Sequence, residues 1–167
     1  MEQPSFVHTM AHTEDGEMGQ GLLMVLREDH QRVKHLLDEL SDTKPKDAQE
    51  RQEKFGELYS GISMHMQFEE ESFYPAVQQK RKSAKEDVAE GFEEHHVARQ
   101  ALDELKSMDM GEERWGTLLK VTKEMIEHHI AEEQAVVFEH AEKSLGESEL
   151  EKMGQQFEEM RSQKSDS

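Results

Sequence analysis

Two segments of this chain repeat one another, and each carries a histidine followed by a His-x-x-x-Glu pair. His30 and His65 are 65 − 30 = 35 residues apart, and His95 and His129 are 129 − 95 = 34 residues apart. Residues i and i+4 lie above one another on one face of a helix. Each repeat therefore predicts two helices joined by a turn, with its histidines and its glutamate on the inner faces.

The repeat extends to the residues around these histidines. Residues 30–40 and 95–105 share the first histidine and the closing Leu-Asp-Glu-Leu. After the His-x-x-x-Glu pair, Phe73–Tyr74 of the first repeat align with Val137–Phe138 of the second. Two helical hairpins of this kind pack as an antiparallel, up-down-up-down four-helix bundle, in which side chains from facing helices meet in the middle.

Apolar rows with helical spacing place each histidine on a face that turns toward a core. Steps of three and four residues alternate along these rows, as they do in helices of a bundle. In chain order the rows are Leu22, Leu26, His30, Val33, Leu37 and Leu40; Phe55, Leu58, Ile62, His65, Glu69, Phe73 and Ala76; Val88, Phe92, His95, Leu102 and Leu105; and Trp115, Leu118, Thr122, Ile126, His129, Glu133 and Val137. A buried glutamate costs free energy unless it is paired or coordinated, so these rows predict a metal site.

The expected organisation is a flexible tail, one bundle and one additional helix. Residues 1–19 show no sustained periodicity, residues 20–143 carry the bundle, and residues 144–167 carry a C-terminal helix with a frayed end. Ser144 and Glu147 have the spacing of a capping box, which predicts the start of that helix. The fold class is therefore all-α, a four-helix bundle with a short fifth helix.

Composition excludes several other kinds of site. The chain has no cysteine, which removes disulfides, thiolate metal sites, iron–sulfur clusters and cysteine nucleophiles. Asp and Glu number 38 against 20 Lys and Arg, for a formal charge of −18. Such a surface repels phosphate backbones and anionic lipids, so neither nucleic acid nor a membrane surface is an expected partner. No apolar run has the length of a membrane span and no signal peptide is evident, so a cytoplasmic protein is expected.

Adjacent residues compete for two of the ligand positions. The third helix offers His95 and His96, and the fourth offers overlapping His-x-x-x-Glu pairs that begin at His128 and His129. Adjacent positions point about 100° apart on a helix, and both the repeat and the apolar rows favour His95 and His129. The neighbours His96, His128 and Glu132 are then expected to hydrogen-bond to the site. The predicted metal ligands are His30, His65, Glu69, His95, His129 and Glu133. Imidazole and carboxylate suit iron, manganese or zinc.

The order histidine, His-x-x-x-Glu, histidine, His-x-x-x-Glu resembles the hemerythrin-like family of cation-binding HHE domains over about residues 22–141. The EEESFYP segment after His65 is part of this resemblance. The resemblance implies two non-haem iron ions joined by a bridging oxo or hydroxo group, with the four histidines as terminal ligands. Glu69 and Glu133 are implied as bridging ligands. Dioxygen is the implied partner, with nitric oxide and peroxide handled by some relatives.

The chain departs from the oxygen-carrying hemerythrins at one position. Those proteins have a second histidine on the third helix at His-x-x-x-His spacing, whereas Arg99 stands four residues after His95. Two histidines, two bridging carboxylates and one bridging oxygen give each iron five donors. If each iron prefers six, both keep an open position, provided that neither Glu70 nor a tyrosine fills it. The sequence does not place Tyr59 or Tyr74 relative to the irons.

The expected function is dioxygen binding for carriage, storage or sensing. One alternative is an enzyme that uses the same centre to act on peroxide or nitric oxide. Another is a bundle that binds a partner and uses the metal only for stability. A ferritin-like oxidase is disfavoured, because its ligands occur as Glu-x-x-His and the paired positions here lack that spacing.

Overall fold

The computed structural model describes residues 21–166, so the tail expected at residues 1–19 lies outside the described residues. Between residues 21 and 166 the regular structure is entirely helical, which confirms the all-α prediction. The helical segments are α1 (Leu22–Asp42), η2 (Pro45–Asp47), α2 (Ala48–Phe68), η3 (Glu69–Phe73), α3 (Tyr74–Lys80), η4 (Lys82–Ala84), α4 (Lys85–Ser107), α5 (Glu113–Glu132), η5 (Glu133–Val137), α6 (Phe138–Ser144) and α7 (Glu147–Ser165).

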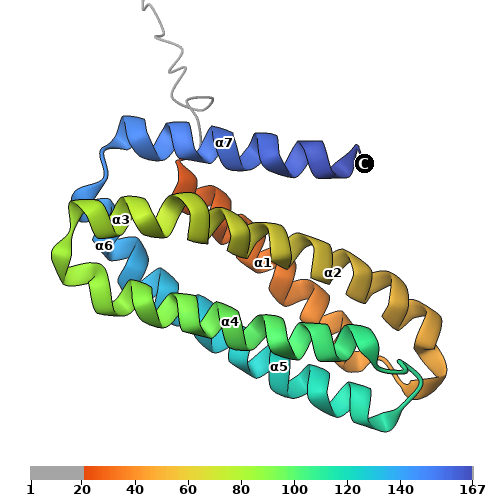
Figure 1. Ribbon diagram of the computed structural model, residues 1–167. Helices are drawn as coiled ribbons and strands as arrows, with labels where there is room; N and C mark the ends of the chain where they lie inside the picture. Colours follow the sequence, from red (N-terminus) through yellow and green to blue (C-terminus); the bar gives the residue numbers. More distant parts are fainter. Residues whose placement is uncertain (1–20, 167) are drawn as a thin grey trace, which may run out of the picture.

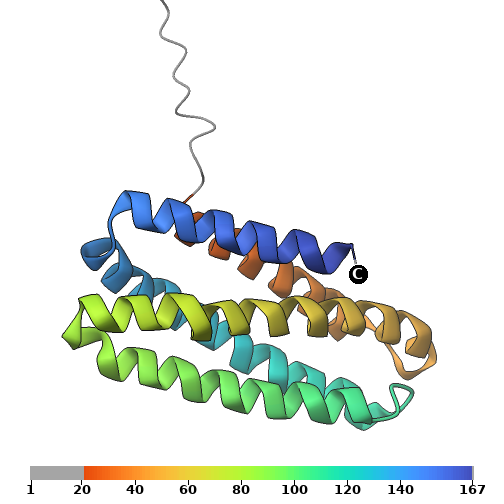
Figure 2. The ribbon, with the colours of Figure 1, turned by 45° about the horizontal axis from the view of Figure 1, so that its top comes forward.

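Helices α1, α2, α4 and α5 run alternately up and down and form the predicted bundle (Figure 1). A π-helix, η3, joins α2 to α3, and a second π-helix, η5, joins α5 to α6, so each pair forms one long rod. Helix α7 returns along one side of the bundle beside α1 (Figure 2). The four-helix bundle with a fifth helix is therefore the observed fold.

Two apolar clusters fill the interior and leave a polar layer between them. One cluster lies where α3, α6 and α7 meet the start of α1, and it includes Phe73, Phe138 and Phe157. The other fills the opposite half of the bundle and includes Leu37 and Trp115. The predicted histidines and glutamates lie between these clusters, where well-packed side chains on both sides hold their positions.

Two details of the sequence analysis are wrong. Leu119 is fully buried in the fourth row, whereas Leu118 is only partly buried. The Ser144 hydroxyl donates to the His140 carbonyl at 2.6 Å instead of capping a helix. Helix α7 begins after Gly146, with no hydrogen bond from a capping side chain.

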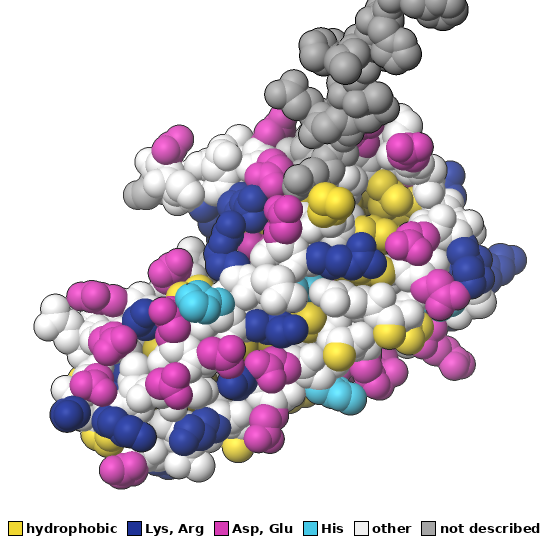
Figure 3. Space-filling view, turned by 180° about the vertical axis from the view of Figure 1, so that it is seen from behind, with side chains coloured by type: hydrophobic (Ala, Val, Ile, Leu, Met, Phe, Trp, Pro, Cys, Tyr) yellow, Lys and Arg dark blue, Asp and Glu magenta, His cyan; other side chains and the backbone are white. Residues whose placement is uncertain are grey.

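None of the described helices is both long enough and apolar enough to cross a membrane. Acidic and basic side chains are interspersed over the face seen in Figure 3.

Candidate metal centre

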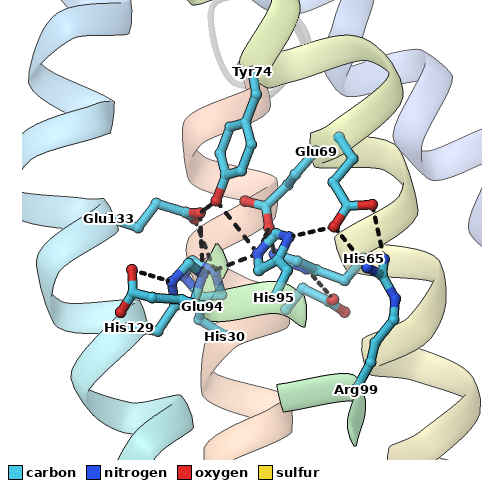
Figure 4. Close-up of polar contacts among 11 residues, drawn as sticks. His30, His65, Glu69, Tyr74, Glu94, His95, Arg99, His129 and Glu133 are labelled. Carbon is cyan, nitrogen blue, oxygen red and sulfur yellow. Dashed lines mark hydrogen bonds and ion pairs between the residues drawn. The ribbon is translucent and has the colours of Figure 1, made fainter. Parts of the chain in front are cut away.

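All six predicted ligands meet inside the bundle, each from a different helical segment (Figure 4). His30 and His95 come from the middle of α1 and α4, His65 and His129 come from the last turns of α2 and α5, and each glutamate is the first residue of a π-helix. Five of the six residues are buried, and the side chain of His129 is 12% exposed. In chain order the residues and their segments are His30 on α1, His65 on α2, Glu69 on η3, His95 on α4, His129 on α5 and Glu133 on η5.

The six side chains form two groups of four, and both groups use both glutamates. His30 and His65 complete one group with Glu69 and Glu133, and His95 and His129 complete the other. His30 Nε2 lies 3.3 Å from Glu133 Oε1, and His65 Nε2 lies 3.2 Å from Glu69 Oε1. In the second group, His95 Nε2 is 3.4 Å from Glu69 Oε1, and the two histidine Nε2 atoms are 3.1 Å apart.

These distances fit the separation of ligands that share an ion. Donor atoms about 2.1 Å from one metal lie about 3.0–3.4 Å from one another in octahedral or tetrahedral arrangements. Four of the donor atoms have no hydrogen-bond partner among residues 21–166 although they are buried: His65 Nε2, both Glu69 oxygens and Glu133 Oε1. Buried polar atoms are almost always satisfied, and a pair of cations would satisfy all four. The residues present therefore fit a dinuclear metal site.

Each of the four histidines of the centre forms a hydrogen bond through Nδ1, the ring nitrogen that faces away from the other ligands, to a polar side chain. The Nδ1 partners are Gln134 for His30 at 2.8 Å, Asp29 for His65 at 2.7 Å, Glu70 for His95 at 3.0 Å and Glu94 for His129 at 3.1 Å. A proton on Nδ1 donates to each acceptor and leaves Nε2, which faces the interior, free to bind a metal. This arrangement is typical of metal-binding histidines.

The sequence analysis missed these four partners, although the repeat contains a signal for them. Asp29 and Glu94 stand directly before the first histidine of their repeats, and Glu70 and Gln134 stand directly after the glutamates. The residues that were expected instead, His96, His128 and Glu132, are exposed. His128 Nε2 lies 3.4 Å from its own helix neighbour Glu132 on the surface. That expectation is wrong, because these side chains point about one residue's rotation away from the interior.

The two π-helices determine which residues follow each glutamate into the interior. A π-helix contains one more residue per turn than an α-helix, so it shifts the buried face by about one position and often occurs at functional sites. After η3 the buried residue is Val77, whereas the α-helical row predicted Ala76, which is only partly buried. The same shift turns Tyr74 inward.

Tyr74 lies at the centre with its ring buried. Its hydroxyl donates a hydrogen bond to Glu133 Oε2 and lies 3.3 Å from His95 Nε2. Arg99 donates hydrogen bonds to both Glu70 oxygens, at 2.8 and 2.9 Å. These bonds hold the Glu70 carboxylate away from the Nε2 atoms of the histidines. Arg99 is thus linked to the centre through Glu70 and His95.

Without metal, the surrounding carboxylates favour the protonated forms of His129 and His65. Burial lowers the pKa of His129, but hydrogen bonds to Glu133 and Glu94 outweigh burial and raise that pKa to about 10. Burial also opposes protonation of His65, yet the charges of Glu69 and Asp29 raise its pKa well above the ordinary value. Burial would raise the pKa of Glu133, but its contacts with His129 and His30 hold it well below the ordinary value. A metal ion would replace these protons.

Two cavities adjoin the centre. The first, of about 20 Å³, is bounded by the four histidines and by apolar side chains that include Val33, Ile62 and Ile126. This volume suits one water-sized or diatomic molecule. The second, of about 100 Å³, is polar and is lined by Tyr74, Glu133 and a group of acidic side chains.

Comparison with known proteins identifies the family of this chain. The family described as the hemerythrin HHE cation binding domain matches residues 21–141. This chain belongs to that family. Membership and the buried histidine and glutamate groups together indicate that the HHE domain described here is a metal-binding domain.

Two similar proteins place the HHE domain among its relatives. A crystal structure of a hemerythrin HHE cation binding domain-containing protein from Mycobacterium kansasii has 24% sequence identity and a TM-score of 0.73, covering 85% of this chain and 86% of that one. At this identity the likeness shows a shared fold. A protein of Nostoc sp. described as a DNA nickase is 25% identical over 133 residues. The match covers 80% of this chain but only 37% of the Nostoc protein.

Proposed function

We propose that this HHE domain holds two iron ions and binds dioxygen reversibly beside them. His30 and His65 would hold one ion, His95 and His129 the other, and Glu69 and Glu133 would bridge the pair. The observation that carries the proposal is the position of the small apolar cavity, which is bounded by both pairs of histidines. Two ferrous ions together can supply the two electrons that a bound dioxygen molecule accepts.

The surrounding residues suit a ligand of this size and polarity. Val33 and Ile62 on one side of the cavity and Ile126 and Ile130 on the other exclude water from the face of the centre that a diatomic ligand would approach. Scarce water and few protons favour release of dioxygen unchanged over its reduction. The held Nδ1 atoms fix the four imidazoles, so a ligand could bind and leave without rearranging the helices.

Anaerobic loading with ferrous iron followed by exposure to air tests the proposal. The proposal predicts two irons per chain and a visible charge-transfer band that appears in air and disappears when oxygen is removed. Repeated cycles should return the same amplitude. Steady consumption of oxygen, or a protein with two irons that does not respond to it, would contradict reversible binding.

One observation favours a second candidate, an enzyme that acts on peroxide or nitric oxide at the same centre. The Tyr74 phenol carries a proton within the site, and it borders a polar cavity with Asp87, Glu90 and Glu94. A proton donor beside the metals favours turnover over simple binding. Catalytic loss of hydrogen peroxide or nitric oxide in an electrode assay, with a turnover number well above one, would support this candidate.

The DNA-nicking description of the Nostoc relative is not proposed for this chain. The match covers 37% of that protein, and a formal charge of −18 repels a phosphate backbone.

A further inference from the structure

The two halves of the centre match at all six predicted ligands, but they differ at the aromatic residue that follows each glutamate. Tyr74 follows Glu69 by five positions, and Phe138 follows Glu133 by five positions. Both rings are fully buried, and each stacks on a histidine: Tyr74 on His95 at 5.4 Å and Phe138 on His30 at 6.0 Å. Only Tyr74 has an oxygen, so the two metal positions are not equivalent.

The Tyr74 oxygen lies where a metal ligand would lie. It is within hydrogen-bond distance of Glu133 Oε2 and 3.3 Å from His95 Nε2, and both atoms belong to the group of four completed by His129. The other contacts within that group fall between 3.1 and 3.4 Å. The hydroxyl is therefore as close to Glu133 Oε2 and His95 Nε2 as the donors of this group are to one another.

A glycine on the facing helix makes room for this hydroxyl. A Cβ atom at Gly91 would lie 3.0 Å from the Tyr74 oxygen and 3.1 Å from the ring carbon that carries it. The equivalent position in the first repeat, 91 − 65 = 26, is the buried Leu26. The chain thus pairs a small residue with tyrosine in one half and a large residue with phenylalanine in the other.

We propose that Tyr74 is a seventh protein ligand, which binds as a phenolate to the ion held by His95 and His129. The inference rests on the proposed function, since it requires iron at both positions. An oxygen–iron bond forms as the O–H bond breaks, and the proton leaves through the polar cavity that Tyr74 shares with Glu94 and Asp87. The stacked His95 ring orients the phenolate, and the absence of a side chain at Gly91 leaves room for it.

This assignment changes the count of open positions. The sequence leaves one open position on each iron, whereas a phenolate from Tyr74 closes the ion at His95 and His129. The ion at His30 and His65 keeps its open position, because Phe138 supplies no donor. A single exogenous ligand should therefore bind per pair of ions, at the ion held by His30 and His65.

Resonance Raman spectroscopy of the ferric protein tests the ligand directly. The chain has two tyrosines, and the other, Tyr59, hydrogen-bonds to Asp103 at 2.6 Å on a part of the bundle outside the centre. Wild type and the matched control Tyr59→Phe should both show vibrations of an iron-bound phenolate. Tyr74→Phe should lose them while it retains two irons per chain, and azide titration should rise from one bound azide per pair to two.

The outcomes separate this inference from the proposed function. Wild type with two irons and no phenolate vibrations, or Tyr74→Phe with an unchanged spectrum, would overturn the assignment of Tyr74 and leave the di-iron site intact. Wild type with fewer than two irons would contradict the proposed function. If Tyr74→Phe does not fold, vibrations that persist in Tyr59→Phe still assign the ligand to Tyr74.

Discussion

His95 and His96 are neighbours in sequence, but only His95 is inside the protein. His95 is 1% exposed and contacts Glu69, Glu70 and His129, whereas His96 faces solvent. We expect His95→Ala to lower the iron content below two per chain and to weaken the visible spectrum. His96→Ala should leave both unchanged. Metal analysis of the two purified variants checks this, and the reverse pattern would show that the helix is placed in the wrong register.

Glu133 and Glu132 provide a second matched pair of variants. Glu133 contacts histidines from both groups, at 3.3 Å for His30 and 3.4 Å for His129. Because a bridging carboxylate serves both ions, Glu133→Ala should release both, not one. Glu132→Ala removes an exposed carboxylate and should retain two irons. Equal iron content in the two variants would rule out a bridging role for Glu133.

The six residues that meet in the centre could be identified from sequence because each occupies a repeated spacing on an apolar row. Their outer partners Asp29, Glu70, Glu94 and Gln134 could not be assigned, since a polar residue beside a ligand faces either solvent or a neighbouring helix. Which of the two it faces depends on how the helices are rotated. Tyr74 was not placed because its orientation depends on a local change of helix type.

At the scale of elements, the periodicity of apolar residues does not predict the π-helices η3 and η5. Both begin at a glutamate of the centre, at matching positions of the two repeats. A row with constant α-helical spacing passes through Glu69 and Phe73 to Ala76, whereas the observed row ends at Val77. The sequence pattern therefore predicts the helices and their buried faces as far as the two glutamates. It does not predict which residues are buried one turn after them.

Helix α7 contributes to the centre although it supplies no predicted ligand. The Phe157 ring meets the His65 ring edge-on at 5.7 Å, and Arg161 lies 3.4 Å from the Asp29 carboxylate that holds His65. Truncation of a fully buried phenylalanine typically costs about 3–5 kcal/mol. We expect Phe157→Ala to lower the free energy of unfolding by about this amount and to speed the transfer of iron to a chelator.

The matched control for this prediction is Gln156→Ala, which alters an exposed residue of the same helix. It should leave both the denaturation midpoint and the rate of iron transfer unchanged. If Phe157→Ala destabilised the protein without changing iron transfer, α7 would stabilise the bundle without supporting His65.

At the scale of the whole molecule, the metal-free and iron-loaded proteins should respond differently to pH. The pKa of His129 rises from 6.5 to about 10 in the folded metal-free protein. Its contribution to stability is therefore complete below pH 6.5 and is lost as the pH rises toward 10. The pKa of Glu133 is depressed from 4.5, so its contribution is present above pH 4.5 and is lost as the pH falls.

Thermal denaturation of both forms at pH 6 and pH 9 measures this difference. The melting temperature of the metal-free protein should be lower at pH 9, because the unfolded chain has then released the His129 and His65 protons that the folded state still binds, so unfolding is favoured more than at pH 6. In the iron-loaded protein these nitrogens carry metal, so the same decrease should be absent. Equal decreases in both forms would assign the effect to surface charge, not to the centre.

The central claim is that one pair of ions lies between Glu69 and Glu133, with two histidines at each ion. A crystal structure of the iron-loaded protein with an anomalous difference map at the iron edge tests it most directly. We predict two peaks about 3.5 Å apart, one beside His30 and His65 and one beside His95 and His129. A single peak, or iron bound at the exposed group of Glu94, His128 and Glu132, would contradict the account.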